Sequence, residues 1–109
     1  MKLTIWLTIV IAVFASAAIA GGDPARGKEK STTCVACHGE NGMSIAPTFP
    51  NIAGQYEDYL YHSLLGYKNG DRKNAIMAGQ VAALTDQDMQ DLAAYYASQQ
   101  GLFPLQISK

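Results

Sequence analysis

Two cysteines and a histidine stand together in the segment Cys34-Val35-Ala36-Cys37-His38. Two thiols three positions apart in a helical turn can form thioethers with the two vinyl groups of one porphyrin, and the next residue brings an imidazole under the iron. C-x-x-C-H is therefore the attachment signature of a c-type haem. The chain has only 2 cysteines, and His38 is one of 2 histidines. The motif predicts one haem c, covalently bound through Cys34 and Cys37, with His38 as an iron ligand.

Other uses of the two cysteines fit the sequence less well. A thioredoxin-like redox pair is expected beside a βαβ pattern, which the chain lacks. A structural zinc site usually needs four Cys or His ligands at characteristic spacings, and these are missing. A plain disulfide is compatible with an oxidising compartment, but it leaves the adjacent His38 without a role. The haem interpretation accounts for all three residues.

A second axial ligand is expected on the other face of the iron, because a Met/His pair is a common haem ligation that raises the reduction potential. Met43 is too close to His38 in the chain to reach the opposite face comfortably, and Met89 falls on the apolar stripe of a predicted helix. Met77 lies further on, beyond a whole predicted helix, and we predict it as the sixth ligand. Its alternative role is core filler. His62 lies off its helix's apolar stripe and is predicted to be a surface residue.

The first twenty residues are predicted to be a signal peptide. Lys2 gives a positive start, Leu3 to Ala17 is apolar, and Ala18-Ile19-Ala20 is a small-x-small cleavage site. The alternative is an uncleaved membrane anchor, since the run is at the short limit of what spans a bilayer. We expect residues 21–109 to form the mature domain and to be exported to the periplasm, where haem attachment to thiols is usual.

Length and charge limit the remaining possibilities. A chain of 109 residues predicts a single domain, and the part left after cleavage can bury only a modest core by itself. A covalently held apolar macrocycle would supply much of the missing interior. The formal net charge is −1 and the sequence has no basic patch, so nucleic acid is a poor candidate partner.

Capping and periodicity signals predict three helices that position these residues. The first runs from about Pro24 toward Cys37, with Asp23 as its N-cap. The second spans Tyr56 to Asn69 and ends at Gly70. The third opens with a capping box at Thr85-Asp86-Gln87-Asp88 and ends before Gly101. The stretch from Gly39 to Gly54 is predicted to be a loop packed on the porphyrin, and residues 71–83 are predicted to be irregular.

These stretches together resemble a class I cytochrome c, in particular the small bacterial monohaem type that is exported to the periplasm. The resemblance covers nearly all of residues 22–100, and it also extends to one half of the tandem dihaem proteins of this class. The matching segments are Gly27, Cys34 to Gly39, Pro47 to Gln55, Asn74 to Met77, and Leu84 to Tyr95. Family members commonly carry a proline shortly before the ligand methionine, whereas this chain has Asn74-Ala75-Ile76.

The resemblance implies an all-α fold of about three to four helices around one haem. It implies that Cys34 and Cys37 form the thioethers, and that His38 and Met77 are the axial ligands. It also favours Pro47 as the residue whose carbonyl accepts the Nδ1 proton of His38, although an ordinary turn is the alternative. Gly27 would meet Tyr95 where the first and last helices cross.

The function expected from these features is one-electron transfer and not catalysis, because two filled axial positions leave no open site for substrate. The implied partners are redox proteins such as membrane cytochrome complexes, terminal oxidases or reductases, met transiently. A membrane would be involved only if the N-terminal segment is retained. Two alternatives remain: a haem subunit of a larger oxidoreductase, and a ligand-binding haem protein in which the methionine is displaceable.

Overall fold

Five α-helices make up the domain in the computed structural model, which describes residues 2–4, 8–12 and 21–101. Within these ranges there is no β-strand, and no helix is long and apolar enough to cross a membrane. The all-α prediction is confirmed. The predicted cleavage site Ala18-Ile19-Ala20 lies outside the described residues. The helices are α1 (Pro24–Lys30), α2 (Val35–His38), α3 (Glu57–Asn69), α4 (Ala75–Val81) and α5 (Asp86–Ala97).

The first predicted helix is divided into three short pieces. Asp23 caps α1 as expected, because its carboxylate accepts the Ala25 N–H at 2.8 Å. A 3₁₀ turn, Ser31–Thr33, then tightens the chain before α2. The Ser31 hydroxyl donates to the Lys28 carbonyl at 2.7 Å, which satisfies a carbonyl at the end of α1. The division therefore turns the chain just before the C-x-x-C-H segment.

The second predicted helix agrees closely with α3. The helix begins at Glu57, one residue later than expected, and it carries acidic residues in its first turn. Gly70 ends it with φ of +89°, a left-handed conformation that glycine adopts without steric cost. Leu60 is buried and anchors α3 to the core, so this helix forms one wall of the domain.

Residues 71–83 were predicted to be irregular, and this was wrong, because they contain α4. Asn74 is extended and its side chain accepts the N–H groups of Ile76 and Met77, which starts the helix. The helix has only seven residues, so its apolar period is too short to be recognised in the sequence. Met77 therefore lies on a helix and not in a loop.

The last helix, α5, supplies most of the core. Its capping box is present as predicted: Thr85 Oγ1 accepts the Asp88 N–H at 3.0 Å, and Asp88 accepts the Thr85 N–H at 2.9 Å. Met89, predicted to be a core residue, is 1 % exposed. The helix ends at Ala97, a little before Gly101. The central cluster of buried residues consists of Leu60, Leu92, Ala93, Tyr95 and Tyr96.

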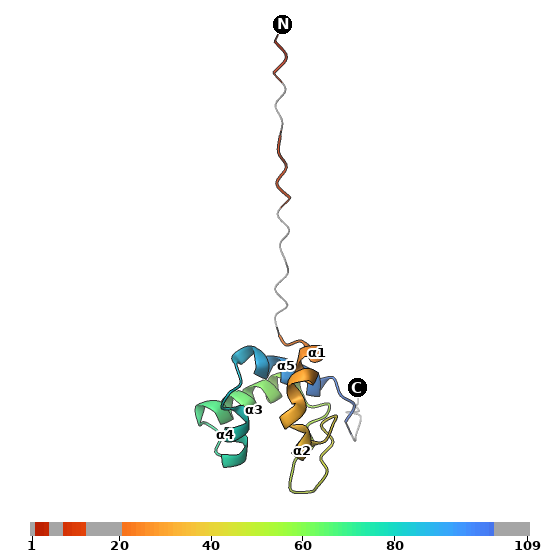
Figure 1. The fold of residues 1–109 in the computed structure, drawn as a ribbon, viewed down its shortest axis with the longest axis vertical. Helices are drawn as coiled ribbons and strands as arrows, with labels where there is room; N and C mark the ends of the chain where they lie inside the picture. The colour runs from red at the N-terminus through yellow and green to blue at the C-terminus, as the bar shows by residue number, and fades with distance from the viewer. Residues whose placement is uncertain (1, 5–7, 13–20, 102–109) are drawn as a thin grey trace, which may run out of the picture.

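Helices α1 and α5 cross at the top of the domain in Figure 1, with α3 and α4 on one side and α2 and its following loop on the other. Gly27 lies at this crossing. A Cβ atom there would overlap the carbonyl of Asp91 and lie 2.7 Å from the Cβ of Tyr95. The predicted close approach is confirmed, and the glycine is needed because the neighbouring helix brings its backbone so near.

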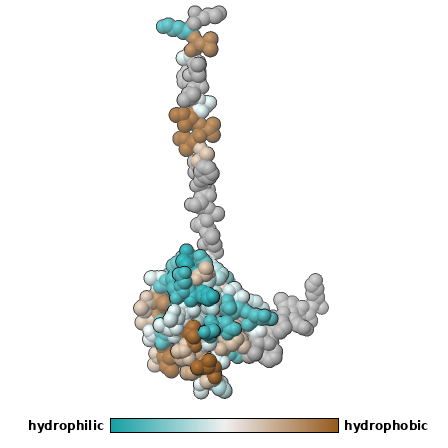
Figure 2. All heavy atoms as spheres, turned by 45° about the vertical axis from the view of Figure 1, so that its right-hand side comes forward, coloured by the Kyte–Doolittle hydropathy of each residue, from teal (hydrophilic) through white to brown (hydrophobic). Residues whose placement is uncertain are grey.

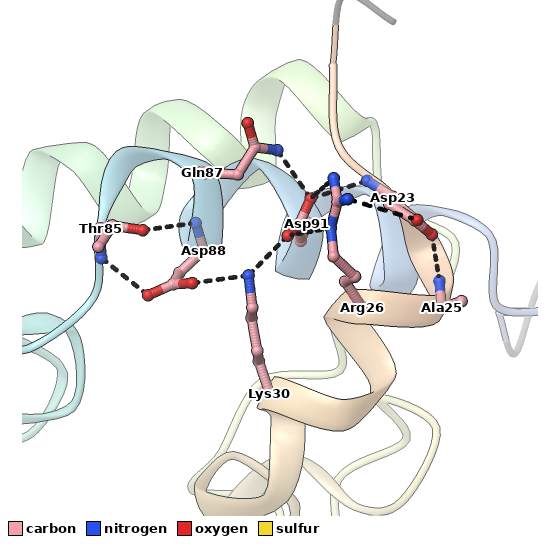
Figure 3. A network of polar contacts seen from close by, with 8 residues as sticks. All are labelled: Asp23, Ala25, Arg26, Lys30, Thr85, Gln87, Asp88 and Asp91. Atoms are coloured by element: carbon pink, nitrogen blue, oxygen red, sulfur yellow. Dashed lines mark hydrogen bonds and ion pairs between the residues drawn. The ribbon is translucent and has the colours of Figure 1, made fainter.

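A buried carboxylate joins the same two helices (Figure 3). Asp91, on α5, is fully buried and accepts the Asp23 N–H at 2.8 Å. It also pairs with Lys30 at 2.6 Å and with Arg26 at 3.2 Å, and the Gln87 amide donates to it at 2.9 Å. Each carboxylate oxygen is thus satisfied, as a buried charge requires. No local sequence pattern predicts this network, because it joins residues that lie more than 60 positions apart along the chain.

Candidate haem site

One cavity of about 390 Å³ brings the predicted site residues together. Cys34, Cys37, His38 and Met77 all line it. The first three come from the turn and helix around α2, and Met77 comes from α4 on the other side of the domain in Figure 1. The rest of the wall is mostly apolar and aromatic, and it includes Phe49, Ile52, Leu60, Leu64, Leu92 and Tyr96. Such a lining suits a large apolar ligand.

Both cysteines are free and partly buried at the edge of this cavity. These two sulfurs would form the thioether bonds to a porphyrin held in the cavity. Burial raises the pKa of the Cys34 thiol, more than its hydrogen bonds with Tyr96 and Thr33 lower it. A neutral, partly desolvated sulfur at this place is compatible with a thioether, which carries no charge.

His38 is buried, and its Nδ1 atom lies 2.9 Å from the carbonyl oxygen of Pro50. The prediction that Pro47 accepts this hydrogen bond was therefore wrong. Pro47 is exposed and does not line the cavity, because the loop turns after it and carries the backbone of residues 48–52 back across the histidine. A carbonyl at Nδ1 fixes the tautomer in which Nε2 is free to bind a metal.

The loop that carries Pro50 is held in place by α5. The Tyr95 hydroxyl donates to the Glu40 carbonyl at 2.9 Å, and the Gly54 N–H donates to the Tyr96 carbonyl at 2.9 Å. Within the loop, the Ile52 N–H donates to the Gly42 carbonyl at 2.8 Å. These bonds fix both ends of the segment, and hence the position of the Pro50 carbonyl against His38.

Of the candidate distal ligands, only Met77 lies on the cavity wall. Met43 does not line the cavity, and Met89 is enclosed in the core. His62 is exposed and does not line the cavity either, in agreement with its predicted surface position. Among the described residues, Met77 is therefore the methionine that lines the cavity, and it does so from α4, across from α2.

Three cavity residues were missed by sequence reasoning. Asn74 caps the helix that carries Met77. Arg72 is exposed and also lines the cavity, where its guanidinium donates to the Ser63 hydroxyl at 2.7 Å and lies 4.8 Å from the centre of the Tyr67 ring. The Tyr96 hydroxyl is buried in the wall of the cavity beside Cys34, and burial raises the pKa of this hydroxyl. Only the Asn74 cap had a local sequence signal, an Asn before a short apolar run.

Comparison with known proteins places this site in a family. The family model described as cytochrome c matches residues 24–100. The chain belongs to the cytochrome c family. It has the class I fold and one haem c bound covalently through Cys34 and Cys37, and the apolar cavity that those two sulfurs border fits such a group. When bound, the haem supplies one-electron redox chemistry.

Several relatives from bacteria align over most of the domain. Cytochrome c-554(548) of Halomonas halodenitrificans is 46% identical over 82 residues, which is 72% of this chain and 99% of that protein. Cytochrome c4 of Pseudomonas aeruginosa is 49% identical over 80 residues, which is 73% of this chain but 40% of that protein. The chain thus spans nearly all of the first relative and less than half of the second.

Solved structures support the same fold. The crystal structure of reduced recombinant cytochrome c4 from Pseudomonas stutzeri superposes with a TM-score of 0.70 at 44% identity. The superposed region covers 73% of this chain and 47% of the cytochrome c4 chain. Cytochrome c4 of Acidithiobacillus ferrooxidans gives a TM-score of 0.67 at 32% identity, covering 76% of this chain and 53% of the other. In both cases the chain corresponds to about half of the larger cytochrome.

Proposed function

We propose that this cytochrome is a one-electron carrier of the periplasm, with the haem iron ligated by His38 and Met77. The observation that carries the proposal is that one cavity is lined by both thiols, by a carbonyl-oriented imidazole and by a single thioether from the far wall. A His/Met pair fills both axial positions and raises the reduction potential. An iron without an open position is suited to passing electrons and not to binding substrate.

Exposed apolar side chains around the cavity support transient docking. Tyr59 and Ile76 line the cavity and are 53% and 61% exposed, and Ile45 on the loop after α2 is 73% exposed. In Figure 2, polar side chains dominate the upper part of the domain and the strongest apolar colour lies lower down. A small apolar contact around the cavity would suit the weak, short-lived complexes of electron transfer.

Redox proteins are the partners that fit such a carrier. A relative from Stutzerimonas stutzeri, named thiosulfate dehydrogenase electron acceptor, is 40% identical over 68 residues, which is 32% of that protein. We infer that an oxidoreductase delivers electrons to this chain, which passes them to a membrane cytochrome complex, a terminal oxidase or a reductase. Residues 1–20 support export, because a positive start, an apolar run and a small-x-small site are typical of a signal peptide. Residues 21–109 would then be the mature domain.

Replacing Met77 tests the ligation directly. In the ferric holoprotein, M77A should abolish the charge-transfer band of methionine-bound iron, lower the reduction potential and allow carbon monoxide to bind the ferrous form. M43A is the matched control, because Met43 does not line the cavity, and it should keep the spectrum and potential of the parent protein. An unchanged spectrum in M77A, or ready carbon monoxide binding by the parent protein, would instead support a ligand-binding haem protein.

A further inference from the structure

The Asn74 side chain accepts a hydrogen bond from the main-chain N–H of Met77, the residue whose thioether is the proposed iron ligand. The backbone of Asn74 is extended, with φ of −153° and ψ of 115°, and its Oδ1 atom accepts two N–H groups of the first turn of α4. The Ile76 N–H lies 3.0 Å from Oδ1, and the Met77 N–H lies 3.1 Å from it. Asn74 and Met77 both line the haem cavity.

Little else in α4 fixes the position of Met77. The helix has seven residues, only Val81 among them is buried, and Gly79 lowers its helical propensity. A helix this short is unstable without tertiary support or a good cap. The first turn, where Asn74 acts, is therefore the part of the helix that decides how the Met77 side chain enters the cavity.

We propose that Asn74 is a positioning residue for the Met77 sulfur: its cap holds the first turn of α4 in the conformation that directs the thioether toward the iron. The proposal depends on the His38/Met77 ligation proposed above. Removing a cap of this kind shifts a conformational equilibrium by about fivefold, which corresponds to a typical loss of about 1 kcal/mol. That shift would favour the form in which the methionine has left the iron.

Competition with imidazole measures this equilibrium. Imidazole binds ferric haem only when the methionine is displaced, so its apparent affinity reports how firmly Met77 is held. In the ferric holoprotein, N74A should bind imidazole about fivefold more tightly than the parent protein. N74A should also lose part of the methionine-to-iron charge-transfer band. N74S should restore both values, because serine caps helices about as well as asparagine.

Thr85→Ala is the matched control for the cap. Thr85 caps α5 through one bond of 3.0 Å to the Asp88 N–H, and it does not line the cavity. T85A should lower the free energy of unfolding by an amount similar to that of N74A, yet leave the imidazole affinity unchanged. A T85A protein that binds imidazole as tightly as N74A would reduce Asn74 to a contribution to general stability and overturn the proposal.

The remaining outcomes separate this proposal from the ligation itself. If the parent protein shows the charge-transfer band, M77A loses it and N74A leaves the imidazole affinity unaltered, the positioning role fails and the ligation stands. If N74S does not restore the affinity, the asparagine amide acts by another contact and the cap is not the cause. If the parent protein has no such band, the ligation fails and the positioning role fails with it.

Discussion

The Nδ1 atom of His38 lies 2.9 Å from the carbonyl oxygen of Pro50, a residue that the loop after α2 places over the imidazole. The hydrogen bond depends on the main chain of the loop, so the identity of the side chain matters only through loop rigidity. Proline restricts its own φ and the conformation of the preceding residue. Pro50 thus limits how far its carbonyl can move from the ring.

This relationship predicts different effects for two prolines. P50A should weaken the hydrogen bond between His38 Nδ1 and the carbonyl of residue 50 by about 0.4–1 kcal/mol. The hydrogen-exchange rate of the Nδ1 proton should therefore rise by up to about fivefold. P47A is the control, since Pro47 is exposed and away from the cavity, and it should leave that rate unchanged. Exchange measured by NMR on the ferrous holoprotein distinguishes them. A larger effect from P47A would contradict the assignment to Pro50.

Two glycines should respond in opposite ways to alanine. At Gly27 a Cβ would overlap the Asp91 carbonyl, and since backbone atoms cannot rotate away, G27A should lower the free energy of unfolding by about 2–3 kcal/mol. At Gly79 a Cβ meets nothing within 4 Å, so G79A should raise the free energy by about 0.5–1 kcal/mol through helix propensity. Chemical denaturation of both holoproteins checks the pair. Equal changes in the free energy of unfolding for G27A and G79A would show that α1 and α5 do not pack this closely.

Asp91 should make stability depend on acid pH. Burial raises the pKa of its carboxyl group, but hydrogen bonds from the Asp23 N–H, Lys30, Arg26 and Gln87 together lower it well below its usual range. A group whose pKa is lower in the folded state stabilises the protein above its unfolded pKa of about 4, and the contribution is lost as the pH falls further. The free energy of unfolding should therefore decline below about pH 4.

The variant D91N tests this origin. It should lower the free energy of unfolding by about 2 kcal/mol at neutral pH, because hydrogen bonds to a charged group are lost. The decline of this free energy below about pH 4 should also become shallower. D71N removes the same charge at an exposed position and should change neither quantity appreciably. Denaturation curves at several pH values provide the comparison. The same acid profile in D91N and the parent protein would assign the pH dependence to other carboxylates.

Intact mass of the secreted protein checks export and attachment together. When the chain is expressed with a haem-attachment system, we expect the mass of residues 21–109 plus one haem. Replacing either Cys34 or Cys37 by alanine should leave one thioether bond at most. A mass that equals the bare polypeptide of 109 residues would reject both covalent attachment and cleavage.

The sequence predicted most of what depends on short spacings. Cys34, Cys37 and His38 are defined by their own motif, and the ends of α3 and α5 follow from Gly70 and the Thr85 capping box. What it could not predict depends on the path of the chain in space. The choice of Pro50 over Pro47 is set by how the loop folds against α5, and the Asp91 network joins residues that no local pattern connects.

Helix α4 shows a different limit. Seven mostly exposed residues give no apolar period, and the helix begins because one side chain, that of Asn74, accepts two N–H groups. The same residue type is common in turns, so the sequence alone did not separate a turn from a helix start. The position of Met77 along the chain was enough to make it a ligand candidate, but the hydrogen bonds between Asn74 and the first turn of its helix became evident only in the folded structure.

The crossing of α1 and α5 also has a consequence for the order of assembly. The hydrogen bond between Asp23 and Asp91 joins residues 68 positions apart, so it forms only after almost the whole domain has been synthesised. Until then α1 and α5 are not packed on each other, and we expect both thiols to be accessible. We expect the haem to be attached to the chain before α1 and α5 pack together, so that covalent attachment precedes the last step of folding.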